Sequence, residues 1–256
     1  MLQKINFKLS CTKTGNVTGY AGSELHGLLF NIIRAVDGEF VRVLHELELK
    51  PFAIGPLRGR CSLKSGLMFL EESNIYSFSL STLNSEMTNL LPYIEKQLRS
   101  GELRLGGATF RLVEAKPIFK KALPYFKLMA VNAEEELRVN FNSLTCFRRD
   151  GKLHLFPLQE LILPGLVKRC EHFSGITLPH LKPEQVLVLQ HNLKTGVAGF
   201  TSYNLVGFKG FCKYGFRPGT LEIDRWLVTL LFNYAAIAGV GYKTTMGMGQ
   251  VRLHHS

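Results

Sequence analysis

The hydrophobic pattern predicts a strand followed by a helix at the start of the chain. Ile5, Phe7 and Leu9 alternate with polar neighbours, which is the period of a half-buried strand. Apolar residues then recur every three or four positions from Leu25 to Val36, the spacing of an amphipathic helix. Ser23 lies just before this run and is expected to cap the helix.

The rest of the first half completes a recognisable order of elements. Short strands are expected at 51–57 and 74–80, a second amphipathic helix at 83–98, and a glycine-containing strand at 102–115. This order, βαββαβ, is that of a ferredoxin-like domain.

The second half repeats the scheme less regularly. Extended segments are expected at 126–131, 137–156, 185–190, 203–216 and 250–254, and helices at 158–173, which contains Pro164, and at 221–238, capped by Thr220. The predicted fold class is therefore α+β, with two tandem ferredoxin-like (RRM-like) βαββαβ domains at 1–124 and 125–256.

The net charge and the cysteines indicate the kind of partner and the cellular compartment. Lys and Arg number 31 against 20 Asp and Glu, a net charge of +11, which favours a polyanionic partner such as RNA. The same charge would also suit a generic basic surface that aids solubility, or a protein that binds an anionic membrane surface. The most apolar run, 226–240, is too short to span a membrane. The five separated cysteines form no CxxC pair, so we expect reduced thiols in a cytoplasmic protein and no zinc ribbon.

A glycine-rich segment, residues 239–249, precedes the last strand. It contains no adjacent Gly-Lys pair as in a P-loop, and it follows a helix rather than opening one. The segment offers close backbone approach and one cation to phosphates or bases. The residues expected to bind RNA here are Gly239, Gly241, Lys243, Thr244, Gly247 and Gly249. The alternative is a tight connection in which glycines only relieve strain.

Five segments together resemble one family of RNA-processing enzymes. They are the glycine-rich segment and residues 25–30, 44–52, 141–148 and 206–214. In this combination the chain resembles the CRISPR repeat-processing endoribonucleases, the sixth Cas protein family of the RAMP superfamily. The resemblance covers most of the chain, although Leu144 stands where the family has a proline.

The resemblance implies a fold, an activity and partners. It implies two ferredoxin-like domains that cleave precursor CRISPR RNA within its repeats, without a metal or other cofactor, to make guide RNAs. The ribose 2′-hydroxyl would attack the adjacent phosphate and leave 2′,3′-cyclic phosphate and 5′-hydroxyl ends. The mature guide RNA, other proteins of a Cas effector complex and a second copy of the chain are further partners considered.

The resemblance also indicates catalytic residues. His45 and Lys50 match the family's catalytic histidine and lysine in order and approximate spacing. The family's tyrosine falls on Phe30, which cannot transfer a proton. On a helix, His26 is the i,i+4 neighbour of Phe30 and could take that role, with Tyr20 as a weaker substitute. The alternative is that His26 and His45 have only structural roles and that Lys50 is an ordinary solvated charge.

Other basic and aromatic residues are expected to line an RNA path. Arg148 and Arg149 lie at a predicted hairpin turn, and Lys209 and Lys213 on a glycine-aromatic strand. Phe208, Phe211 and Tyr214 on the same strand would either stack on bases or pack in the core. A non-catalytic RNA-binding subunit is the main alternative to an enzyme, because of Phe30. A general single-strand RNA binder is disfavoured, because no RNP-type aromatic motif is present.

Overall fold

The first half of the chain forms a five-stranded antiparallel sheet covered by helices. A computed structural model describes residues 1–254. The strands of this sheet are β1 (Gln3–Lys13), β3 (Phe52–Ile54), β6 (Ile75–Thr82), β7 (Leu103–Leu105) and β8 (Ala108–Pro117). Their order is β3-β6-β1-β8-β7. With β7 left aside, the order is that of a ferredoxin-like sheet, because the first and third strands pair at its centre.

The second half forms a four-stranded sheet with the same relative order. Its strands are β9 (Leu137–Thr145), β12 (Val186–Gly199), β13 (Asn204–Phe216) and β14 (Val251–His254), arranged β12-β13-β9-β14. The prediction of an α+β fold with two ferredoxin-like units is therefore confirmed. The boundary at residue 124 stays a prediction.

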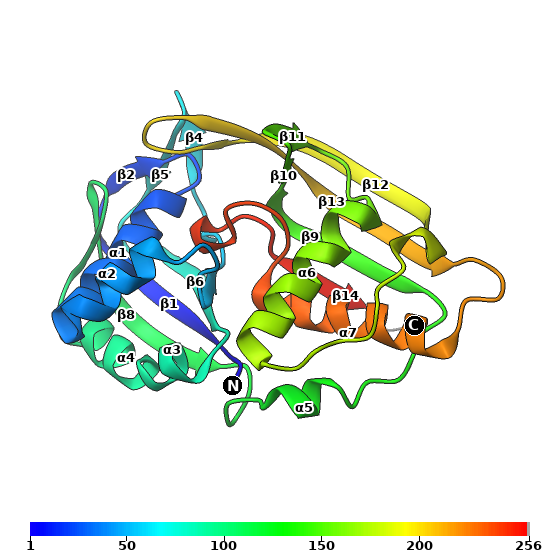
Figure 1. The fold of residues 1–256 in the computed structure, drawn as a ribbon. Helices are drawn as coiled ribbons and strands as arrows, with labels where there is room; N and C mark the ends of the chain where they lie inside the picture. Colours follow the sequence, from blue (N-terminus) through cyan, green and yellow to red (C-terminus); the bar gives the residue numbers. More distant parts are fainter. Residues whose placement is uncertain (255–256) are drawn as a thin grey trace.

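Helices cover one face of each sheet (Figure 1). In the first half they are α1 (Gly22–Val36), α2 (Gly38–Glu46), α3 (Ser85–Asn89) and α4 (Leu91–Arg99); in the second half they are α5 (Tyr125–Leu128), α6 (Gln159–Ser174) and α7 (Glu222–Ala238). The alternation of β1 decides which side is covered. Ile5, Phe7 and Leu9 are buried in the core with the apolar stripe of α1, as predicted.

Both predicted N-terminal caps are wrong. The residue before α1 is Ala21 in a left-handed conformation, and Ser23 lies inside the helix. Leu221 precedes α7, and the Thr220 hydroxyl instead donates to the carbonyl of Arg217. In α1 another residue occupies the cap position, and before α7 the Thr220 hydroxyl bonds within the preceding turn instead of capping the helix.

Three other segments also differ from the prediction. The helix expected at 83–98 is two helices, because the chain turns at Leu90 and Pro92 opens α4. Residues 126–131, expected to be extended, include most of the short helix α5. A small sheet of β2 (Gly15–Thr18), β5 (Leu67–Leu70) and β4 (Ser62–Lys64) was not expected, since its strands are only three or four residues long.

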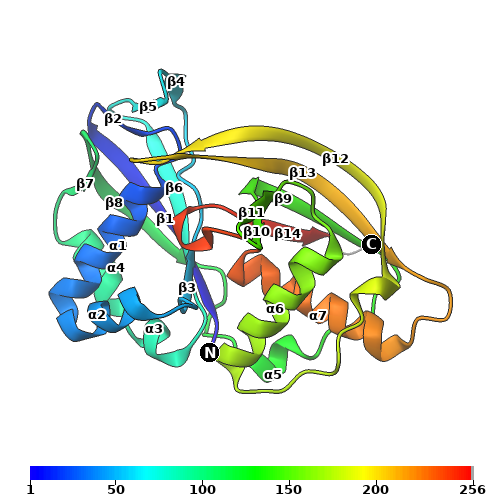
Figure 2. The same ribbon diagram turned by 45° about the horizontal axis from the view of Figure 1, so that its top comes forward.

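The long β12–β13 hairpin joins the two halves. Its tip reaches the first half beside the small β2-β5-β4 sheet (Figures 1 and 2), and there Phe200 packs against Tyr20 with ring centroids 5.9 Å apart. The glycine-rich segment also crosses toward the first half, with a 3₁₀ turn, η2 (Thr244–Met246), against α1 and β3. A shorter hairpin, β10 (Phe147–Arg149) and β11 (Lys152–His154), follows β9, as the turn at 148–151 predicts.

Among residues 1–254, no helix combines the length and the apolarity that crossing a membrane requires.

Candidate active site and RNA-binding surface

The two candidate histidines both contact one phenylalanine. His26 and Phe30 belong to α1 and are neighbours, as their spacing predicts; their ring centroids are 4.4 Å apart. His45 lies in the last turn of α2, and its ring centroid is 4.5 Å from that of Phe30. Phe30 is only 3% exposed, whereas His45 is exposed. The site therefore presents two imidazoles that share contact with a buried apolar ring.

The glycine-rich segment completes this site from the other half of the chain. The Nδ1 atom of His26 is 3.2 Å from the carbonyl oxygen of Thr245. Burial lowers the pKa of His26, and the nearby charges of His45, Lys243 and Lys50 act in the same direction. The Thr245 carbonyl opposes this shift, since it stabilises a protonated ring. His26 is consequently neutral near pH 7 and able to accept a proton.

Lys50 lies beside the histidines but is engaged by the main chain. Its Nζ donates to the carbonyls of His45, at 2.9 Å, and Leu47, at 2.6 Å. A cation in this position stabilises the C-terminal end of α2. Burial lowers the pKa of Lys50 from its usual value. Its catalytic role stays a prediction beside this structural one.

Tyr20 does not suit the proton-transfer role considered for it. Its hydroxyl donates to the carbonyl oxygen of Gly247 at 3.0 Å, and burial raises the pKa of Tyr20 to about 12. Within residues 1–254, His, Cys, Asp and Glu side chains form no group of three that could hold a metal ion.

The four predicted glycines all adopt positive φ angles, between 70° and 86°. A Cβ atom at Gly241 would meet the carbonyl of Cys146, and one at Gly249 the carbonyl of Val240. These glycines are thus required for the segment to pack against the protein, which supports the alternative of a tight connection. Thr244 is buried, so its side chain faces the protein rather than solvent. RNA contacts by these residues stay a prediction.

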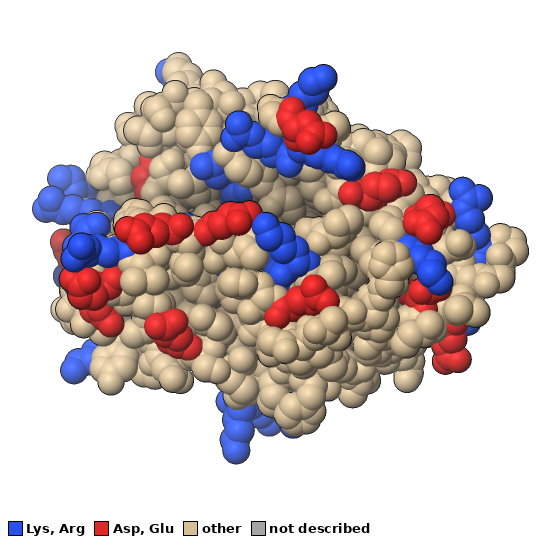
Figure 3. All heavy atoms as spheres, in the orientation of Figure 1, with Lys and Arg blue, Asp and Glu red and all other residues tan. Residues whose placement is uncertain are grey.

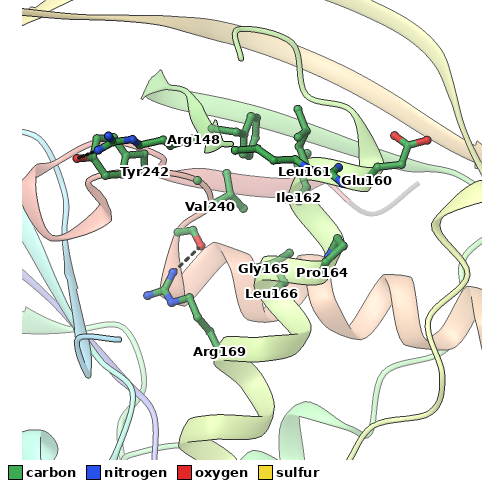
Figure 4. Close-up of a pocket in the computed structure, with 14 residues that line it drawn as sticks. Arg148, Glu160, Leu161, Ile162, Pro164, Gly165, Leu166, Arg169, Val240 and Tyr242 are labelled. Carbon is green, nitrogen blue, oxygen red and sulfur yellow. Dashed lines mark hydrogen bonds between the residues drawn. The ribbon is translucent and has the colours of Figure 1, made fainter. Parts of the chain in front are cut away.

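Other predicted RNA-binding residues line a pocket of about 390 Å³ (Figure 4). Arg148 and Arg149 of β10 line it together with residues 239–242, and the guanidinium of Arg148 is 3.4 Å from the Tyr242 hydroxyl. The sequence did not indicate Arg169 of α6, whose Nη1 donates to the carbonyls of Ala238 and Gly239. Only the tertiary fold brings this helix to the segment.

The residues predicted on β13 divide into exposed and buried ones. Lys209 is exposed and pairs across the hairpin with Lys194, whereas the ammonium of Lys213 forms an ion pair with Glu136. Phe208 and Tyr214 are fully buried, so the prediction that they stack on bases is wrong, and both rings pack in the core. Phe211 lies under the guanidinium of Arg138, 3.9 Å from its ring centroid.

A second basic surface was not expected from the sequence. A cleft of about 680 Å³ between the two halves contains Lys4, Lys8, Arg58 and Arg252. Lys4 and Lys8 occupy the polar positions of β1, so the alternation that predicted the strand also contained this signal. Burial, with a smaller contribution from Arg58, lowers the pKa of Lys4 to about 8.

Basic side chains also gather on the face seen in Figure 3. They follow the upper edge of the hollow at its centre, over the region that β10, β11 and the β12–β13 hairpin occupy in Figure 1. A polyanion lying in this hollow would pass the glycine-rich segment.

Comparison with known proteins finds related sequences. The family model of the CRISPR-associated endoribonuclease Cas6 matches residues 139–251. A Cas6 endoribonuclease of Mycobacterium tuberculosis is 23% identical over 247 residues, which cover 91% of this chain and 71% of the relative. One of Streptococcus thermophilus is 22% identical over 240 residues, 90% of each chain.

Solved structures share the fold along the whole chain. One described as a Cas6 product complex is 25% identical, covers 99% of both chains and has a TM-score of 0.79. The Cas6 of Thermus thermophilus is 20% identical, with 99% and 98% of the two chains covered and a TM-score of 0.71. The chain is therefore similar, in sequence and in fold, to the CRISPR-associated endoribonucleases of the Cas6 family.

Proposed function

We propose that the chain cleaves CRISPR repeat RNA by attack of a ribose 2′-hydroxyl on the adjacent phosphate. The single observation that carries this proposal is that His26 and His45 both contact the Phe30 ring, so two imidazoles lie at one site. An in-line reaction needs proton transfer at two oxygens on opposite sides of phosphorus, and two separated imidazoles suit that requirement. The similarity to a product complex supports RNA as the substrate.

The proposed roles follow from burial and exposure. His26 is neutral because burial lowers its pKa, so it accepts the 2′-hydroxyl proton. His45 is exposed and donates a proton to the departing 5′-oxygen. The bond from the 2′-oxygen to phosphorus forms as the bond to the 5′-oxygen breaks. A 2′,3′-cyclic phosphate and a 5′-hydroxyl are left.

A cation is expected to stabilise the charge that develops on the phosphate. Lys50 and Lys243 both lie close enough to influence the pKa of His26. Lys50 already binds two carbonyls, whereas Lys243 lies over the rings of Tyr203 and Tyr242, 5.5 Å and 5.1 Å from their centroids. Because both lysines lie near the site, we propose that they stabilise the developing negative charge of the phosphate together, one from each half of the chain.

The end chemistry tests this proposal directly. Repeat RNA incubated with the protein in EDTA should yield cyclic phosphate ends. A single 2′-deoxy substitution at the cleaved nucleotide should abolish cutting, because it removes the nucleophile. RNA with the same substitution elsewhere is the matched control. Cleavage of the 2′-deoxy substrate, or an absence of cleavage in EDTA, would contradict the mechanism.

RNA affinity should fall linearly with salt on a log–log scale, because counterions are released from neutralised phosphates. The double variant R148A/R149A should have a shallower slope, by roughly one for each phosphate that it no longer neutralises. Lys8→Ala would show whether the interdomain cleft also contributes. Filter binding at several salt concentrations measures the slopes. A salt-independent affinity would exclude phosphate contacts as the source of binding.

The site also fits a second candidate, a subunit that binds repeat RNA without cleaving it, since Phe30 replaces a proton-transferring side chain. Intact but bound RNA in the EDTA experiment would favour it. In either case we propose a cytoplasmic protein that keeps its guide RNA and delivers it to other Cas proteins. Light scattering would show whether the protein forms a homodimer.

A further inference from the structure

The glycine-rich segment contacts α1 and the residues just before it at three successive points. The Thr245 carbonyl lies 3.2 Å from Nδ1 of His26. The Met246 carbonyl lies against Gly22, where a Cβ atom would collide with its oxygen. The Gly247 carbonyl accepts a hydrogen bond from Tyr20 at 3.0 Å. Three consecutive carbonyls therefore face the start of the helix that bears His26.

A carbonyl at Nδ1 decides where the imidazole proton resides. A neutral imidazole has one N–H group and one accepting nitrogen, and a carbonyl oxygen can only accept. The proton must therefore be on Nδ1 when the bond to Thr245 forms. Nε2 is then left with a free lone pair, which is what a general base needs.

The surroundings restrict the ring further. Phe30 and Phe52 lie beside it, with centroids 4.4 Å and 6.0 Å from that of His26. The ionisable groups that influence it are His45 of α2, Lys50 after that helix, and Lys243 of the glycine-rich segment. Since all three are basic groups, they oppose a second proton on the imidazole.

We propose that the glycine-rich segment is a positioning element for the catalytic base, in addition to any contact with RNA. Its Thr245 carbonyl fixes His26 as the Nδ1–H tautomer, and Gly22 and Tyr20 keep that carbonyl in place. The proposal rests on the proposed function, in which His26 accepts the 2′ proton. It makes cleavage depend on how the second half of the chain docks on the first.

Two variants of the contact and one matched control test this inference. Gly22→Ala places a methyl group against the Met246 carbonyl, and Tyr20→Phe removes the bond to Gly247. Gly27→Ala changes the same helix at a position where a Cβ atom meets nothing within 4 Å. Single-turnover cleavage, RNA affinity and the imidazole ¹⁵N spectrum would be measured for each, with His26→Ala used to assign the His26 signals.

We expect wild-type His26 to be protonated on Nδ1. Gly22→Ala and Tyr20→Phe should lower the cleavage rate by about tenfold or more, part of the usual contribution of a general base, with RNA affinity nearly unchanged. Their spectra should show protonated Nε2. Gly27→Ala should behave as the wild type. Thermal unfolding shows whether Gly22→Ala is folded, and Tyr20→Phe tests the same contact without a steric clash.

The outcomes separate the two proposals. A wild-type spectrum with protonated Nε2, or wild-type cleavage in a Tyr20→Phe variant whose tautomer has changed, would overturn the positioning role alone. Unchanged tautomers and rates in both contact variants would also overturn it, because the carbonyls would then need no support. Full cleavage by His26→Ala would instead overturn the role of His26 as base, whatever its tautomer.

Discussion

Replacing His45 by alanine should slow single-turnover cleavage by roughly 10²–10⁴-fold, the usual contribution of general acid–base catalysis. His45 is exposed at the end of α2, so little packing disappears with its ring. RNA affinity should change little, because His45 is a single exposed side chain and the many Lys and Arg residues supply most of the attraction to phosphate. Cleavage under enzyme excess and equilibrium binding to a 2′-deoxy substrate measure the two effects separately.

The same experiment with His26 tests whether the two histidines act together. His26→Ala should also slow cleavage strongly, and the double variant should be much less than multiplicatively slower, because members of one catalytic unit are non-additive. Burial holds the pKa of His26 below its usual 6.5. The rate should therefore rise with pH through a value below 6.5, and this acid limb should be absent in His26→Ala.

Circular dichroism is needed to show that each variant is folded. A folded His45→Ala protein with the wild-type rate would remove His45 from the mechanism. If His26→Ala instead keeps both the rate and the acid limb, the two-histidine scheme is wrong. Phe30→Tyr would then restore the family's residue, and a gain in rate would show that this position has lost an acid–base function.

Gly249→Ala should destabilise the protein and weaken cleavage. A non-glycine residue at positive φ costs about 1–2 kcal/mol by itself. A Cβ atom at this position would also collide with the Val240 carbonyl, so the segment has to move. Because the segment supplies the Thr245 carbonyl, displacement should disturb the His26 site as well as folding.

Gly219→Ala is the matched control, since its φ of 82° is also positive but a Cβ atom there meets nothing within 4 Å. The difference in the free energy of unfolding between the two variants, from urea titration, isolates the steric term. Equal decreases in stability, with cleavage intact in both, would show that the glycine-rich segment tolerates displacement and is only a connector.

Local pattern determined much of this protein. The alternation at Ile5, Phe7 and Leu9 and the helical spacing from Leu25 to Val36 fix strand β1 and helix α1, because each places its apolar residues on one face that must be buried. The contact between His26 and Phe30 also follows from sequence, since i and i+4 residues are neighbours on any helix.

Helix starts were less predictable, because a hydroxyl residue at the right position can bond to another local group. Thr220 donates to Arg217, and Ser23 lies within α1 rather than before it. The break at Leu90 follows from Pro92, whose preference for the first turn of a helix opens α4. The residue at which a helix starts depends on a small energy difference between competing local hydrogen bonds.

Only the tertiary structure decided how the candidate site is completed. Thr245 and His26 are 219 positions apart, and the carbonyl that faces Nδ1 belongs to the main chain, so no side-chain pattern could indicate it. The four glycines are suited to close contact with RNA, but their positive φ angles and the protein atoms packed against them show that the fold itself requires them. Distant contacts of this kind depend on how two separately patterned sheets dock, and periodicity within each sheet does not contain that information.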